Sequence, residues 1–230
     1  MKILVLSLFF AFGLNIQAQV QSAGKAMNVM KGISLENHID FDSIPKTNLF
    51  ALAPASDLQG EVTIFDGKII HSEADKQNIL TKFPKSIKTP FSAYAKVDNW
   101  IKVTADVDVK DVKSLQNQIE IIAKANDINL NMPFVFKIEA KIEKLDFHII
   151  QKDLNEKAHS HDLHKKSKTN FTRTYSESIL LGFYSQHHQG IFTHKGEFVH
   201  IHYLSKDLSE TGHLDALRHS GKIDIYFSKF

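Results

Sequence analysis

Residues 198–215 read Phe-Val-His-Ile-His-Tyr-Leu-Ser-Lys-Asp-Leu-Ser-Glu-Thr-Gly-His-Leu-Asp. The first seven residues have the pattern of a strand, and side chains of a strand alternate between its faces, so His200 and His202 project from the same side. A turn-rich segment then leads to His213. If the chain reverses midway through this turn, His202 and His213 become cross-strand neighbours, with Cβ atoms about 5 Å apart.

Three histidines on one face of a sheet form a ligand set for a metal ion. Imidazole nitrogens suit zinc or another borderline divalent ion and leave positions open for a carboxylate, water or substrate. We therefore predict a metal site of catalytic type at His200, His202 and His213. The alternative is a polar strand face exposed to solvent, because a His-X-His pair alone is a weak signal.

Strand patterns dominate the rest of the chain. Asp66-Gly67 between two apolar runs predicts a hairpin, whereas apolar residues at helical spacing predict a helix over 110–125, capped by Asp108 or Asp111. Residues 134–150 predict one long strand whose apolar face changes near Glu143-Lys144, which requires a bulge or tight turn. Further strands are predicted at 101–107, 179–183, 190–192, 198–204 and 223–227.

The N-terminus has the features of a signal peptide. One basic residue, Lys2, precedes the apolar run 3–14, and the small residue Ala18 follows. The run is short for a membrane span, so we expect cleavage after Ala18 and an exported protein, periplasmic or secreted, without a membrane anchor.

The fold class predicted for the remaining 212 residues is α+β, dominated by sheet, with two packed α/β subdomains and mixed β-sheets. The predicted N-terminal subdomain is 19–150, a polar connection follows at 151–170, and a C-terminal β subdomain at 171–230 carries the histidine strands. A formal charge of +2 with lysines interspersed among acids argues against nucleic acid as a partner. The absence of cysteine excludes disulfides and thiolate ligands.

Seven short motifs occur in a particular order along residues 26–227. They are Leu58-Gln59-Gly60-Glu61, Phe65-Asp66-Gly67, Thr89-Pro90-Phe91, Leu180-Leu181-Gly182-Phe183, Gln189-Gly190-Ile191, the run 199–207, and Gly212-His213-Leu214-Asp215. Their order resembles that of the α-acetolactate decarboxylase family, and the resemblance implies the fold of that family.

The resemblance implies a metal-dependent decarboxylation of 2-acetolactate to acetoin and CO2. His200, His202 and His213 would be the ligands of Zn²⁺ or another divalent ion, which acts as a Lewis acid. Glu61 would match a catalytic glutamate that lies near the metal, although by itself it reads equally as a surface acid at a strand start. The partner would be a small 2-hydroxy-3-keto acid, and the family tends to pair subunits, which leaves a homodimer open.

Two features depart from the family pattern. His148 stands where the family has an arginine near the metal, and the chain ends at 223–230 without a counterpart of the family's C-terminal glutamate. A protonated His148 would offer a positively charged hydrogen-bond donor, although it cannot make the two parallel hydrogen bonds of an arginine. We therefore count His148 as a catalytic candidate. The alternative is an ordinary exposed strand residue.

The other histidines have simpler interpretations. Those of the polar connection, His159, His161 and His164, are predicted to be solvated, whereas those flanking Gly190 would line the mouth of a pocket: His187, His188 and His194. Two functions compete with the carboxy-lyase. One is a non-catalytic relative that binds a metal or a small hydroxy acid, and the other is a metal-dependent hydrolase, which the neighbouring motifs do not support.

Overall fold

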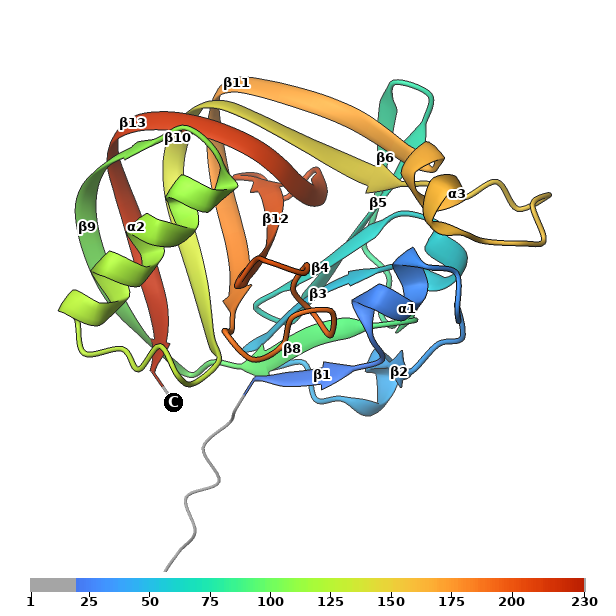
Figure 1. Cartoon of the computed structure of the whole chain (residues 1–230), viewed down its shortest axis with the longest axis horizontal. Helices are drawn as coiled ribbons and strands as arrows, with labels where there is room; N and C mark the ends of the chain where they lie inside the picture. Colours follow the sequence, from blue (N-terminus) through green and yellow to red (C-terminus); the bar gives the residue numbers. More distant parts are fainter. Residues whose placement is uncertain (1–19, 230) are drawn as a thin grey trace, which may run out of the picture.

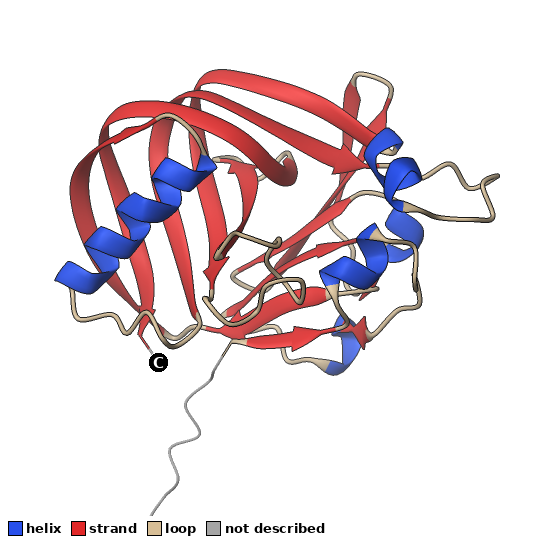
Figure 2. Ribbon diagram, viewed as in Figure 1, coloured by secondary structure: helices blue, strands red, loops and turns tan. Residues whose placement is uncertain are grey.

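Two packed sheets make up most of the computed structural model, which describes residues 20–229 (Figures 1 and 2). The predicted signal segment 1–18 therefore lies outside the described residues. The sheet-dominated α+β class is confirmed. The predicted mixing of parallel and antiparallel strands is wrong, since every pairing between the named strands is antiparallel. Antiparallel neighbours need only short turns, as between β4 and β5 and between β12 and β13.

The first sheet has six strands in the order β1-β8-β3-β4-β5-β6. Their bounds are β1 Gln21–Ala23, β3 Leu49–Pro54, β4 Glu61–Phe65, β5 Lys68–Asp75, β6 Asn78–Lys82 and β8 Ser92–Lys96. The predicted hairpin joins β4 to β5, where Asp66 and Gly67 have φ values of 49° and 79°. Positive φ at both central residues is typical of the type I′ turn that matches the twist of a hairpin.

The second sheet has five strands in the order β10-β11-β12-β13-β9. Their bounds are β9 Asn99–Val109, β10 Phe134–Ile150, β11 Lys168–Tyr184, β12 Val199–Ser205 and β13 Thr211–Lys229. Because β10 also pairs with β13, strands β10 to β13 form a closed ring of pairings that leaves few free edges. The pairing of β10 with β13 shifts register between Glu139 and Lys144, which confirms the predicted irregularity.

The main helix, α2 (Val112–Ala125), packs against β9 and β13. Asp111 caps it, as predicted: its Oδ1 accepts a hydrogen bond from the Ser114 amide at 2.6 Å, and Ser114 Oγ accepts one from the Asp111 amide. The shorter elements are α1 Ala26–Met30, α3 His161–Lys166, the 3₁₀ turns Phe41–Ser43 and Ser56–Leu58, and the pair β2 Ile39–Asp40 with β7 Lys88–Thr89. None of the helices in residues 20–229 is long and apolar enough to cross a membrane.

The two sheets divide the chain at a different place from the predicted subdomains. Strands β9 and β10 precede the polar connection, yet they belong to the same sheet as β11 to β13. The sheet therefore changes at residues 97–98, between β8 and β9, and not at 151–170. That connection contains α3 and ends where β11 begins, while the predicted strand at 190–192 is a turn inside a loop.

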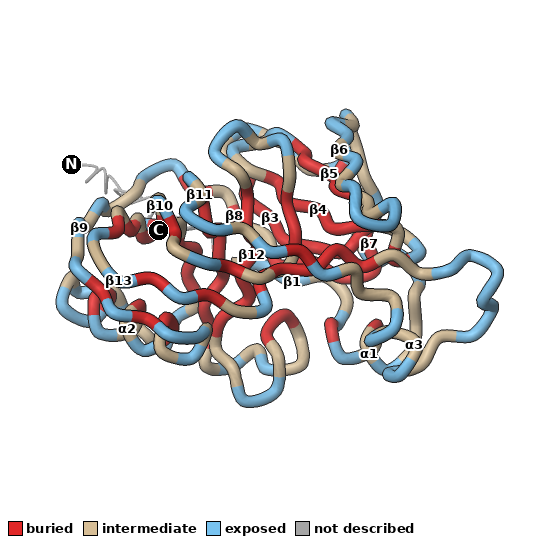
Figure 3. The backbone as a smooth tube through the Cα atoms, turned by 90° about the horizontal axis from the view of Figure 1, so that it is seen from above, coloured by how far each residue is buried: buried red, intermediate tan, exposed pale blue. Residues whose placement is uncertain are grey.

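Buried residues follow the strands of both sheets (Figure 3). One core lies within the five-stranded sheet beneath α2 and includes Phe136, Tyr203 and Phe227. A second core contains side chains of both sheets, such as Leu52 and Leu181, and therefore joins them. The interior contact of β4 with β13 brings polar side chains of the two sheets together at this junction.

Candidate metal centre and active site

Strands β12 and β13 bring the three predicted ligands to one face. His202 lies opposite His213 in the antiparallel register, which confirms the predicted neighbours. His200 lies two residues before His202 and so shares its face. The ring centroids are 5.1 Å apart for His200–His202 and for His200–His213, and 5.9 Å apart for His202–His213.

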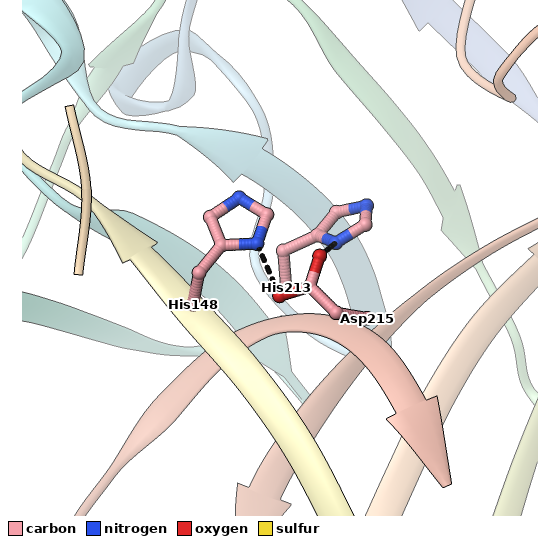
Figure 4. Close-up of side chains that lie close together, drawn as sticks. All are labelled: His148, His213 and Asp215. Atoms are coloured by element: carbon pink, nitrogen blue, oxygen red, sulfur yellow. Dashed lines mark hydrogen bonds and ion pairs between the residues drawn. The ribbon is translucent and has the colours of Figure 1, made fainter. Parts of the chain in front are cut away.

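Strand β10 adds His148, which lies opposite His213 on the other side of β13. Its side chain is buried, so the alternative of an exposed strand residue is wrong. Asp215 Oδ2 accepts a hydrogen bond from His148 Nδ1 at 2.7 Å, and Asp215 Oδ1 lies 3.7 Å from His213 Nδ1 (Figure 4). Because the carboxylate fixes the proton on Nδ1 of His148, its Nε2 keeps a free lone pair that faces the pocket.

Strand β4 of the other sheet supplies Glu61. This carboxyl group is buried, so the alternative of a surface acid is also wrong. Its Oε2 lies 3.6 Å from His202 Nε2, and its Oε1 lies 3.9 Å from His148 Nε2. Glu61 therefore stands between two imidazoles of the five-stranded sheet.

A chain of buried hydroxyl groups fixes the tautomer of His202. Thr211 Oγ1 donates its hydrogen to the Tyr203 carbonyl, so it accepts the hydrogen of Thr63 Oγ1 at 2.7 Å. Thr63 has then used its only hydrogen and must accept one from His202 Nδ1 at 2.9 Å. His202 Nε2 is consequently an unprotonated nitrogen, and it is one of the buried atoms without a hydrogen-bond partner.

Two glycines permit this close packing of the ligand strands. A Cβ atom at Gly212, before His213, would lie 2.4 Å from Phe147 Cδ2 and 2.7 Å from the His148 carbonyl oxygen. Gly60, before Glu61, has a φ of 109°, and a Cβ there would lie 2.4 Å from the Ser72 carbonyl oxygen.

The pocket in front of these side chains is open to solvent, and its empty space, open solvent included, is about 480 Å³. Apolar residues of both sheets and of α1 line part of it, among them Val29, Phe91 and Ile150. Phe91 stacks on the ring of His200, with centroids 6.1 Å apart. Three further polar groups line the pocket, namely His164 of α3, Lys168 at the start of β11, and His194 of the loop 185–198.

Burial controls the protonation of the pocket. Burial lowers the pKa of His200 and His202 well below its ordinary value, and it lowers the pKa of His194 and His213 to about 4. The same effect raises the pKa of Glu61 well above 4.5. Without a metal, the imidazoles are therefore neutral near pH 7, and neutral imidazole is the form that binds metals.

The donor set fits a divalent cation. Buried nitrogens of all three predicted ligands lack hydrogen-bond partners: His200 Nδ1, His202 Nε2 and His213 Nδ1. A tetrahedral ion with Zn–N distances of about 2.0–2.1 Å would place ring centroids roughly 5 Å apart, close to the observed separations. A cation would also offset the cost of burying the Glu61 carboxylate.

Among residues 20–229, the one group of three potential ligand residues whose ligand atoms all lie within 4.8 Å of one another is a different set from the three predicted ligands. His148, His213 and Asp215 each bring one such atom within 4.8 Å of the others, so His213 belongs to both sets. His148 and Asp215 of this set are joined by a short hydrogen bond, so they form a hydrogen-bonded pair beside His213.

Sequence reasoning missed part of the pocket. His164 was expected to be solvated, yet it lines the pocket, and burial lowers its pKa to about 3. His194 lines the pocket as expected, with its Nε2 3.3 Å from His213 Nε2, whereas His187 is exposed. The signal for Asp215 was available, because it lies two residues after His213 on the same strand. Nothing in the local pattern marked Lys168.

Two antiparallel sheets with a buried histidine and carboxylate pocket at their junction define a candidate metalloprotein. The profile of the alpha-acetolactate decarboxylase family matches residues 22–230. The chain therefore belongs to the alpha-acetolactate decarboxylase family, which confirms the resemblance. A comparison with curated proteins finds no match.

Solved structures agree with this assignment at the level of the fold. Alpha-acetolactate decarboxylase from Bacillus subtilis strain 168 has a TM-score of 0.72 and 17% identity, covering 92% of this chain and 86% of that one. The enzyme from Bacillus subtilis subspecies spizizenii has a TM-score of 0.71 and 17% identity, covering 92% and 87%. A Staphylococcus aureus protein of unknown function, similar to alpha-acetolactate decarboxylase, has a TM-score of 0.71 and 16% identity, covering 92% and 85%.

Proposed function

We propose that this chain is a zinc-dependent carboxy-lyase that converts 2-acetolactate to acetoin and CO2. The observation that carries the proposal is the convergence of Glu61 with three neutral histidines in one buried pocket, in a chain of the alpha-acetolactate decarboxylase family. A divalent ion bound there would supply a Lewis acid that stabilises the negative charge left when CO2 departs.

The sheet face determines which residues would hold the ion. His200, His202 and His213 would bind it through their unprotonated nitrogens. Thr63 would keep the ring of His202 in place through the hydrogen bond to Nδ1. The apolar side chains of Phe91 and Ile150 would exclude water from the reacting carbon.

The pair formed by Glu61 and His148 would handle the proton. Loss of CO2 leaves an electron pair on the carbon that carried the carboxylate, and one proton must be delivered there to give acetoin. Glu61, whose Oε2 lies 3.6 Å from His202 Nε2, would be the residue that delivers this proton. The free lone pair of His148 Nε2 lies 3.9 Å from Glu61 Oε1, so this nitrogen would first take up a proton from solvent and then pass it to the Glu61 carboxylate.

The test is turnover of racemic 2-acetolactate by the zinc-loaded protein, measured as acetoin formed. We expect turnover that a chelator abolishes and that His202→Ala removes together with stoichiometric zinc. His187→Ala changes an exposed histidine and should leave both unchanged. Zinc-loaded protein that forms no more acetoin than the metal-free control would refute the lyase and favour the non-catalytic binding relative.

A further inference from the structure

Lys168 is the single lysine or arginine among the described residues that line the pocket. It is the first residue of β11 and lies opposite Ile150 of β10. Cross-strand neighbours share a face, and Ile150 shares its face with His148 two residues earlier. The register of β10 and β11 therefore directs the Lys168 side chain into the pocket, on the face that carries the histidines.

The ammonium group of Lys168 lies near the site, and its hydrogen-bond donors are not paired with another described residue. Its Nζ lies 3.9 Å from Asp215 Oδ1, and 28% of the side chain is exposed. This distance exceeds that of a hydrogen bond, and within residues 20–229 no hydrogen bond joins the group to another residue. Its three donors are therefore available to a ligand.

The positive charge of Lys168 acts on several groups of the pocket. In addition to the larger effect of burial, it lowers the pKa of five groups: Glu61, His148, His164, His194 and His213. Among the described residues that line the pocket, Lys168 therefore offers the one ammonium group, in addition to any ion that the histidines hold.

We propose that Lys168 binds the carboxylate of the ligand, so that the pocket selects small 2-hydroxy or 2-oxo acids over uncharged hydroxyketones. A partly buried ammonium favours an anion through charge-assisted hydrogen bonds. The inference deepens the proposed function, since 2-acetolactate carries such a carboxylate and acetoin does not. Lys168 would then hold the acid and release the neutral product.

The experiment compares two ligands that differ by one charge. The probes are 2-hydroxy-2-methylpropanoate and its uncharged amide, titrated calorimetrically into zinc-loaded protein. We expect the acid to bind wild-type protein more tightly than the amide does. Lys168→Met should weaken binding of the acid about ten-fold or more, while binding of the amide changes less than about two-fold.

Three controls separate the charge from structural effects. Lys168→Arg should keep most of the preference for the acid, because it keeps the charge. Lys166→Met removes an exposed lysine two residues away and should behave as wild type. Zinc stoichiometry and the melting temperature should match wild type in each variant, as expected for a partly exposed side chain.

Several results would overturn the inference. The inference is wrong if the acid binds wild-type protein no more tightly than the amide. It is also wrong if Lys168→Met weakens binding of the acid and of the amide equally, or weakens neither. Failure of the proposed function looks different, because zinc-loaded protein could bind the acid through Lys168 and yet form no acetoin. Conversely, if Lys168→Met forms acetoin with an unchanged kcat/KM, the inference about Lys168 is wrong while the proposed lyase activity is supported.

Discussion

Replacing Thr63 with valine is expected to weaken zinc binding although Thr63 is not itself a ligand. The hydroxyl group accepts the Nδ1 hydrogen of His202 and thereby fixes the ring with Nε2 toward Glu61. Valine has nearly the same shape but accepts no hydrogen bond. Thr63 is fully buried, so water cannot take the place of the hydroxyl.

The size of the effect follows from the single hydrogen bond that Thr63 makes to the ring of His202. Partners that orient a metal-bound histidine typically contribute a factor of about 10 to 100 in metal affinity. This factor corresponds to about 1.4 to 2.7 kcal/mol of binding free energy. Thr63→Val also removes the hydrogen bond that Thr63 donates to Thr211, but Thr211 keeps its own bond to the Tyr203 carbonyl.

The assay is competition for zinc between the protein and a chromophoric chelator. Thr172→Val is the control, because it removes an exposed strand threonine whose hydroxyl donates to Asp146. We expect unchanged affinity in the control and a loss of about 10- to 100-fold in Thr63→Val. A folded Thr63→Val protein with wild-type zinc affinity would refute the tautomer derived for His202.

Three further perturbations test the site and its surroundings. Glu61→Gln should keep zinc but lower kcat for acetoin formation by about 10² to 10⁴, and unchanged kcat would exclude Glu61 as proton donor. Gly212→Ala should lower the free energy of unfolding by about 1–3 kcal/mol, because its Cβ meets Phe147; a thermal melt checks this. Metal-free protein should lose stability as pH falls from 6.5 toward 4, since the unfolded chain takes up protons that buried His194 and His213, with pKa values of about 4, do not. Each histidine accounts for up to about 1.4 kcal/mol per pH unit, and equal urea midpoints at about pH 7 and 5 would contradict it.

Periodicity predicted the local parts of the fold. Strand alternation placed His200 and His202 on one face, and the length of the turn placed His213 opposite His202, because both depend on contacts within a short stretch of chain. The change of face near Glu143 likewise required an irregularity, which the register of β10 and β13 shows.

Periodicity could not predict which strands belong to which sheet. The polar composition of 151–170 indicated a boundary, but polarity reports exposure and says nothing about which strands pair. β10 and β11 run antiparallel on either side of that connection, so the sheet continues through it. Lys168 and His164 reach the pocket for the same reason, because the connection folds back over the end of β10.

The site is divided between the two sheets in a way that links metal binding to their packing. β4 provides the carboxyl of Glu61 and the hydroxyl of Thr63, whereas β10, β12 and β13 provide the imidazoles. The five-stranded sheet carries the imidazoles and Asp215, but Glu61 reaches the imidazoles only from the six-stranded sheet. An ion that bridges the two sheets binds the packed state and not the separated sheets, so it stabilises their junction by mass action. The buried Glu61 and the unpartnered nitrogens, which cost stability in the metal-free protein, are the same groups that would make the packed state selective for a cation.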